Sequence, residues 1–207
     1  MMPLSSETEQ EHDEALRKVL EVFKSRGILL NQSKCVFKVP EITFVGHRLS
    51  SKGVQPTEEK TAVLKSFRAP SSAEELRSFL GLVTYVGRFL PDLATVTEPL
   101  RELLRKGVSF HWDGRHEEVF QHIKTMICNI SHLQYFDNRL RTRLIADASP
   151  VALGAVLVQF SERDNIPRVV SYASKSLSST EKRYCQTEKE ALALVWAVER
   201  FSMYLLG

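Results

Sequence analysis

The sequence predicts an α/β (α+β) protein in which a run of helices precedes a mainly antiparallel, three-stranded meander and one packed helix. Apolar residues recur at helical spacing through residues 57–127, whereas residues 144–174 consist of short apolar runs separated by turn residues. The chain of 207 residues can hold one large domain or two small ones, and its 43% hydrophobic and 26% charged residues are ordinary for a folded protein.

Composition narrows the class of protein further. No apolar run approaches the length that spans a membrane, and the N-terminal stretch is polar and acidic, unlike a signal sequence. We therefore expect an intracellular protein, in the cytoplasm or the nucleus, with no membrane as a partner. Cys35, Cys128 and Cys185 lie too far apart in the sequence for a zinc site, so reduced thiols are expected.

The N-terminal part predicts a helix and two strands. The helix covers residues 9–26 and ends at Gly27. Two apolar runs, residues 35–39 and 42–49, flank a proline and are expected to pair as strands. Gly46 interrupts the second run, which usually marks a bulge or the close approach of another backbone. That backbone could belong to nucleic acid or, more simply, to a neighbouring strand.

Four helices are expected next, each with its own start signal. Their expected ranges are 57–67, 73–89, 93–104 and 113–127, and the second begins at Ser71 or Ser72 with a glutamate that closes a capping box. Gly81 lies in the middle of the second helix, where a glycine costs about 1 kcal/mol relative to alanine. We expect something to pack closely over it, either a neighbouring helix or a ligand.

An aspartate interrupts the apolar stretch of residues 144–160, which predicts two strands joined by a tight turn. A carboxylate at a core position of a strand needs a charged partner, a cation or a water-filled cleft, since its burial alone costs several kcal/mol. Asp147 therefore indicates a functional site. The alternative, with equal weight, is a turn aspartate that caps its own backbone.

The C-terminal residues predict a third strand, residues 169–174, and a helix that Thr187 caps. Glu188 and Glu190 lie in the first turn of this helix, where the helix dipole by itself favours negative charge. The apolar residues expected to face the core are Ala191, Leu192, Leu194, Val195 and Val198.

Basic charge is concentrated around Asp147. The net charge is +4 over residues 138–183, against +3 for the whole chain. Arg139, Arg141 and Arg143 alternate, so an extended backbone would place them on one face, as a surface that tracks phosphates requires. An edge strand that is protected from aggregation by its charges is an equally common explanation.

Several strings in a fixed order resemble the polyprotein of gypsy-type long-terminal-repeat retrotransposons, from the end of the reverse transcriptase palm into the RNase H domain. The strings are LNQSKCVFKVPEITFVGHRLSSKGVQP, EELRSFLGLVTYVGRFLPDL, FHW with the helix that follows it, IADASPVALGAVLVQ, and VVSYASKSLSSTEKRYCQTEKEALALVWAVERFSMYLLG. The resemblance covers about residues 8–207. It implies a helical thumb bundle followed by a partial RNase H-like fold.

The resemblance also implies a division of the chain and a role for each part. The expected segments are 1–56 as the C-terminal end of the palm, 57–107 as the thumb, 108–140 as the connector, and 141–207 as a truncated RNase H-like domain. The residues that match a primer-gripping hairpin are Phe44, Val45, Gly46 and His47. Those that match the thumb helix tracking the minor groove are Arg77, Gly81 and Tyr85. Asp147 and Glu190 match the first two metal-binding, catalytic carboxylates of RNase H, and Glu188 is a weaker match to the second.

The family activity that this implies is RNA-directed DNA polymerase (nucleotidyltransferase) together with an endonuclease, a hydrolase that cuts RNA in RNA/DNA hybrids with Mg²⁺ or Mn²⁺. Its partners would be an RNA/DNA hybrid or a template–primer duplex, with the remainder of the polyprotein. No adjacent pair of aspartates occurs in the chain, and half of the RNase H carboxylates would follow Gly207. We therefore expect the chain to be incomplete for either reaction alone. The alternative is a non-catalytic nucleic-acid-binding remnant or an inert relic of a retrotransposon.

Overall fold

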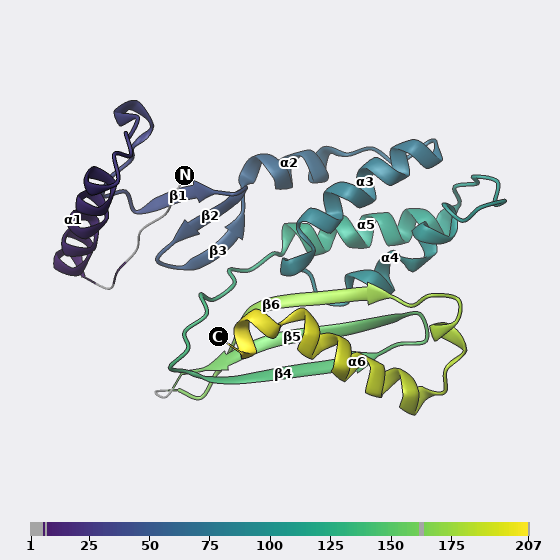
Figure 1. Cartoon of the computed structure of the whole chain (residues 1–207). Coiled ribbons are helices and arrows are strands. Elements are labelled where there is room, and N and C mark those ends of the chain that lie inside the picture. The colour runs from purple at the N-terminus through teal and green to yellow at the C-terminus, as the bar shows by residue number, and fades with distance from the viewer. Residues whose placement is uncertain (1–5, 7, 162–163, 207) are drawn as a thin grey trace. The chain divides into compact units, whose positions relative to one another are not determined.

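The computed structural model describes residues 6, 8–161 and 164–206. The chain divides into two compact units, residues 1–51 and residues 52–207. Figure 1 shows the order of their helices and strands along the chain. No helix within the described ranges has both the length and the apolar character needed to cross a membrane.

The first unit contains one long helix and a hairpin. Helix α1 (Glu9–Ser25) begins with a capping box, in which the Thr8 hydroxyl and the Glu11 carboxylate each accept a backbone hydrogen bond. The short helix η1 (Gln32–Lys34) follows it. Strands β1 (Glu41–Phe44) and β2 (His47–Ser50) pair antiparallel.

The prediction of a strand at residues 35–39 was wrong, because both strands come from the second apolar run. Gly46 does not form a bulge; it lies with Val45 in the two-residue turn between β1 and β2. Both turn residues have positive φ, 47° at Val45 and 74° at Gly46. Such turns match the right-handed twist of paired strands, so this turn closes the hairpin within residues 42–49.

The second unit begins with helices packed around aromatic side chains. Phe79 on α3 lies between Phe67 and Phe120, with ring centroids 5.3 Å and 4.8 Å away. The Ser72 hydroxyl caps α3 by accepting from the Glu75 amide, which settles which of the two serines is the cap. The elements are β3 (Gly53–Pro56), α2 (Glu58–Ser66), α3 (Ala73–Tyr85), η2 (Gly87–Phe89), α4 (Leu93–Glu102) and α5 (Gly114–Cys128).

An antiparallel three-stranded sheet forms the other half of this unit, as predicted. Its order is β4 (Arg141–Ala148), β5 (Ala152–Phe160) and β6 (Pro167–Ser176). After the sheet come η3 (Glu181–Arg183), α6 (Gln186–Arg200) and α7 (Ser202–Leu205). Helix α6 lies across one face of the sheet (Figure 1).

The face of α6 that packs on the sheet differs from the predicted one. Leu194, Val195 and Val198 were expected to be buried, yet each is between 49% and 58% exposed. The core instead takes Ala193 and Ala197, with Leu192 packed against them as expected. Small side chains at these two positions let the helix approach the strands closely, and Ala191, which was also expected to face the core, is exposed. The helix also begins earlier than predicted, with Cys185 rather than Thr187 as its N-cap.

Helix α4 contacts the sheet through β5 and β6. The Ala94 amide donates to the Ser174 hydroxyl at 3.0 Å, and the hydroxyls of Thr95 and Ser149 are 3.1 Å apart. This end of α4 therefore lies close to the turn that follows β4. Asp147 is in β4, just before that turn.

Candidate functional site

Asp147 is the second-last residue of β4 and lies opposite Gly154 of β5. Its neighbour Ala148 packs with Leu153 and Ala193 of α6, so strand alternation directs Asp147 to the other face of the sheet. The side chain is exposed, and therefore the burial cost considered from the sequence does not arise. The turn after β4 is capped by Ser149, whose hydroxyl accepts from the Val151 and Ala152 amides. Capping of the turn thus does not require Asp147.

Glu190, the second predicted carboxylate, lies on the first turns of α6 and is also exposed. Gln186 connects it to β4: the side-chain Nε2 donates to the Ala148 carbonyl at 2.9 Å and to Glu190 Oε1 at 3.3 Å. Glu190 therefore lies near the end of β4 that carries Asp147, on a helix that packs on the opposite face of the sheet from the Asp147 side chain. Glu188 has a different role, since its carboxylate accepts from the Cys185 amide at 2.8 Å and caps the helix.

Asp92 approaches the same face of the sheet as Asp147, which the sequence did not indicate. A Cβ atom placed on Gly154 would lie 2.8 Å from Asp92 Oδ1, so a side chain at position 154 would require the Asp92 carboxylate to move. Asp92 has a φ of 48°, an unusual conformation for a residue other than glycine. Burial of the Tyr172 hydroxyl and, to a smaller extent, the charge of Asp92 raise the pKa of Tyr172.

The described residues do not include a group of three or more His, Cys, Asp or Glu side chains placed to hold a metal ion. The carboxylates of Asp147 and Glu190 are nonetheless the hard oxygen ligands that Mg²⁺ prefers. These two carboxylates fit a magnesium site as two of its ligands and do not complete it.

The three predicted arginines separate into a pair and a single residue. Arg141 and Arg143 lie in β4 and both stand over the Phe160 ring, at 4.6 Å and 5.0 Å from its centroid. Arg139 precedes the strand and binds Asp137 with an Nη2–Oδ2 distance of 2.8 Å. Arg139 is therefore not part of the extended stripe, contrary to the sequence pattern. This ion pair holds the pKa of Asp137 down at about 2.

The remaining predicted residues lie on the hairpin of the first unit and on α3 of the second. Phe44 and His47 are paired across the hairpin, and Val45 at its tip is 73% exposed. On α3, Gly81 has no described atom within 4 Å of the position that a Cβ would occupy. Contact with another helix of this chain therefore does not explain the glycine, and this surface of α3 is open.

The three-stranded antiparallel meander and the helix packed on it form a mixed α+β domain. Residues 112–207 match the family described as "RNase H-like domain found in reverse transcriptase". This part of the chain is an RNase H-like domain of the reverse transcriptase type.

The whole chain has relatives among retrotransposon polyproteins. It is 33% identical over 202 residues to the Transposon Tf2-3 and Tf2-4 polyproteins of Schizosaccharomyces pombe, in alignments that cover 98% of this chain and 15% of each relative. Nearly the whole chain is thus similar to a part of these retrotransposon polyproteins. Nothing in these comparisons favours the alternative of a non-catalytic remnant or a relic.

Solved structures show the same fold. The structure of a foamy viral protease-reverse transcriptase in complex with RNA/DNA hybrid has a TM-score of 0.80 and 24% identity, over 98% of this chain and 27% of the viral one. A second structure of that protein, in complex with dsDNA, has a TM-score of 0.77 over 97% of this chain and 42% of the other. The mixed helical and sheet architecture predicted from the sequence is confirmed.

Proposed function

We propose that this chain contributes the primer-gripping hairpin, the thumb helix and the first two metal-binding carboxylates to a reverse transcriptase with RNase H activity. Its substrates would be RNA/DNA hybrids and template–primer duplexes, and its partner would be the remainder of a polyprotein. The observation that carries the proposal is the hydrogen-bonded connection through Gln186 between the end of β4, where Asp147 lies, and Glu190. The foamy viral structures with RNA/DNA hybrid and dsDNA support the choice of substrate.

In this proposal Asp147 and Glu190 would hold Mg²⁺ or Mn²⁺ through their carboxylate oxygens. The metal would activate water and stabilise the leaving oxygen when the RNA strand is hydrolysed. Gln186 fixes the orientation of Glu190 by donating to it while it is anchored on the Ala148 carbonyl. Both carboxylates are exposed and therefore accessible to a cation.

Two exposed surfaces, the hairpin and one side of α3, would bind the nucleic acid. The hairpin residues Phe44, Val45, Gly46 and His47 would contact the primer terminus, with Val45 projecting at the tip. The line of Arg77, Gly81 and Tyr85 on α3 would follow the minor groove, where the absence of a side chain at Gly81 lets a duplex backbone approach. We place this action inside the cell, in the cytoplasm or the nucleus, where such nucleic acids occur.

The metal site can be tested without relying on catalysis. Mn²⁺ is paramagnetic, and we expect it to broaden the NMR signals of residues around Asp147 and Glu190. Asp147→Asn should abolish this broadening, whereas Asp164→Asn should not, because Asp164 is already paired with Arg168 at 2.9 Å. Broadening that is unchanged by Asp147→Asn would refute the role of Asp147 as a ligand.

A cleavage assay then tests whether the chain acts alone. A labelled RNA/DNA hybrid is incubated with Mg²⁺ and either the wild-type chain or Asp147→Asn. Cleavage only by the wild-type chain would mean that the two carboxylates are completed within the chain or by its self-association. Metal binding without cleavage would limit the chain to supplying ligands within a larger protein.

Gly81→Ala separates a binding role of α3 from a structural one. The Cβ meets no described atom within 4 Å, and alanine is favoured over glycine in a helix by about 1 kcal/mol. We therefore expect the variant to be more stable in urea denaturation and to bind a template–primer duplex more weakly. Ser78→Ala, another exposed position on the same helix, serves as the control for binding. Unchanged affinity of Gly81→Ala would exclude close approach of the duplex at this point.

A further inference from the structure

Arg141, Arg143 and Phe160 form an arrangement that the sequence pattern did not contain. Arg141 lies directly opposite Phe160 in the pairing of β4 with β5, and Arg143 lies opposite Val158. Both guanidinium groups therefore reach the same aromatic ring, at 4.6 Å and 5.0 Å from its centroid. A guanidinium that stacks on a ring keeps its N–H groups directed outward and free to donate. We call these three residues the arginine fork.

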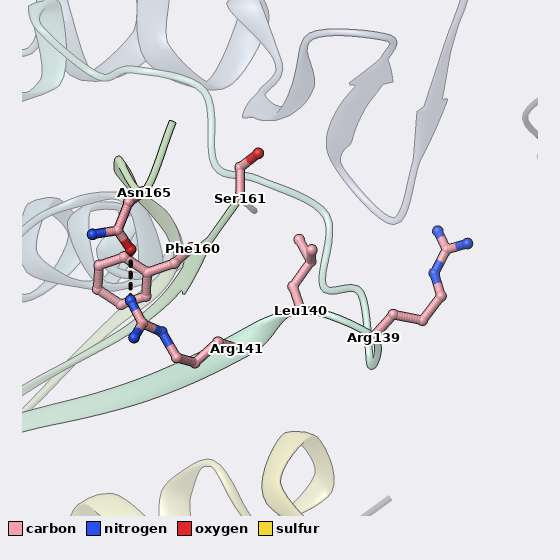
Figure 2. A pocket seen from close by; sticks show the side chains of 6 residues that line it. All are labelled: Arg139, Leu140, Arg141, Phe160, Ser161 and Asn165. Carbon is pink, nitrogen blue, oxygen red and sulfur yellow. Dashed lines mark hydrogen bonds between the residues drawn. The ribbon is translucent and has the colours of Figure 1, made fainter. Parts of the chain in front are cut away.

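The acidic side chains near the arginine fork are already paired with other cations. Asp137 binds Arg139, and Asp164 binds Arg168. Arg141 donates one hydrogen bond to Asn165 Oδ1 at 2.6 Å, and Arg143 has no hydrogen-bond or ion-pair partner in the part of the chain that the structure describes. Figure 2 shows Arg141 and Asn165 joined beside the Phe160 ring, while Arg139 points away from them. The fork therefore presents two positive charges that nearby described carboxylates do not neutralise.

The arginine fork and Asp147 share one exposed stripe of β4. Side chains alternate along the strand, so Arg141, Arg143, Ile145 and Asp147 project from the same face, and all four are exposed. Arg143 is four residues from Asp147, which corresponds to about 13 Å at about 3.3 Å per residue. A nucleic acid strand that rises about 3.4 Å per nucleotide covers this distance in about four nucleotides.

We propose that the arginine fork binds the phosphodiester backbone of a nucleic acid strand that runs along β4, about four nucleotides from the point at which the strand passes Asp147. Phe160 is a positioning residue, since it orients both guanidinium groups and does not itself contact phosphate. The direction of the strand toward Asp147 rests on the proposed function. The surface binds an anionic strand because it carries two guanidinium charges that no described carboxylate pairs with.

The test compares substitutions of single arginines, each of which removes one positive charge. Binding of a short, labelled RNA/DNA hybrid is measured by fluorescence anisotropy over a range of salt concentrations. Arg143→Gln should weaken binding about fivefold to tenfold and lower the slope of log affinity against log salt by about one. Arg168→Gln, which removes a cation already paired with Asp164, should change affinity by less than about twofold. The double variant at Arg141 and Arg143 should lower the slope by about two.

Phe160→Leu tests the positioning role. It leaves the net charge unchanged, yet we expect it to lower the salt slope, because the guanidinium groups are no longer held together. Phe160→Tyr keeps a ring and should restore wild-type binding. Circular dichroism spectra and thermal midpoints establish that each variant is folded. Equal weakening by Arg143→Gln and Arg168→Gln would overturn the inference, because net charge alone would then explain binding.

The same measurements separate this inference from the proposed function. In buffer without divalent metal, Asp147→Asn should bind the hybrid at least as tightly as the wild type, because it removes a negative charge from the stripe. Fork-dependent binding without a metal signal at Asp147 would uphold the arginine fork and overturn the carboxylate role. A metal signal at Asp147, combined with fork variants that bind like the wild type, would overturn the arginine fork alone.

Discussion

Gly53→Ala is expected to destabilise the second unit by about 3 kcal/mol, because position 53 cannot accept a side chain. Gly53 has a φ of 119°, and a Cβ atom there would lie 2.2 Å from the Leu133 carbonyl oxygen. That oxygen accepts the Val54 amide at 2.8 Å, and the Leu133 amide donates back to Val54 at 2.9 Å. Alanine would force the two segments apart and break this pair of hydrogen bonds. The measurement is the free energy of unfolding from urea denaturation.

Gly107→Ala is the matched control for this prediction. Gly107 also has a positive φ, 84°, but no described atom lies within 4 Å of its Cβ position. Alanine there should cost only the conformational penalty of about 1 kcal/mol. The difference between the two variants therefore isolates the clash with Leu133. Equal losses of unfolding free energy at the two positions would show that the hydrogen-bonded pair of Val54 and Leu133 can shift without loss of stability.

The sequence was sufficient to predict most elements, including the strand that carries Asp147. Helices with clear caps, such as the one that Asp113 begins, agree with the structure to within a few residues because capping and periodicity are local properties. The inward face of α6 was not predictable in the same way. Which side of a helix is buried depends on the strands beneath it, and here these select Ala193 and Ala197 rather than Leu194.

The residues of the candidate site also differ in whether the local sequence could indicate them. A carboxylate that interrupts an apolar strand is visible in the sequence, and Asp147 was identified on that basis. Gln186, Asp92 and Phe160 were not, because each acts through a residue distant in the sequence that the fold brings close. The glycine at position 154 was the one local signal of such a contact, and it could not indicate which side chain approaches.

Glu98, which is buried, forms an ion pair with the partly exposed Lys182, and disruption of this pair should have an effect as large as that of Gly53→Ala. Glu98 on α4 is 7% exposed, and its carboxylate binds both Lys182 of η3 and Arg105, the latter at 2.7 Å. Removing one member of a buried pair leaves the other charge uncompensated, at a typical cost of about 3 to 5 kcal/mol. We expect Lys182→Met to cost about 3 kcal/mol, at the lower limit because Arg105 remains.

This ion pair also connects α4 to η3, the helix directly before α6. The helix η3 lies directly before α6, so loss of the Glu98 contact should loosen the segment that carries Glu190 as well as lower the free energy of unfolding. Lys175→Met is the control, since Lys175 pairs with Glu181 at the surface, where such pairs contribute at most about 1 kcal/mol. Urea denaturation gives the energies, and amide hydrogen exchange in α6 reports the loosening. If Lys182→Met and Lys175→Met cost the same, the burial of Glu98 adds nothing to the strength of its ion pair.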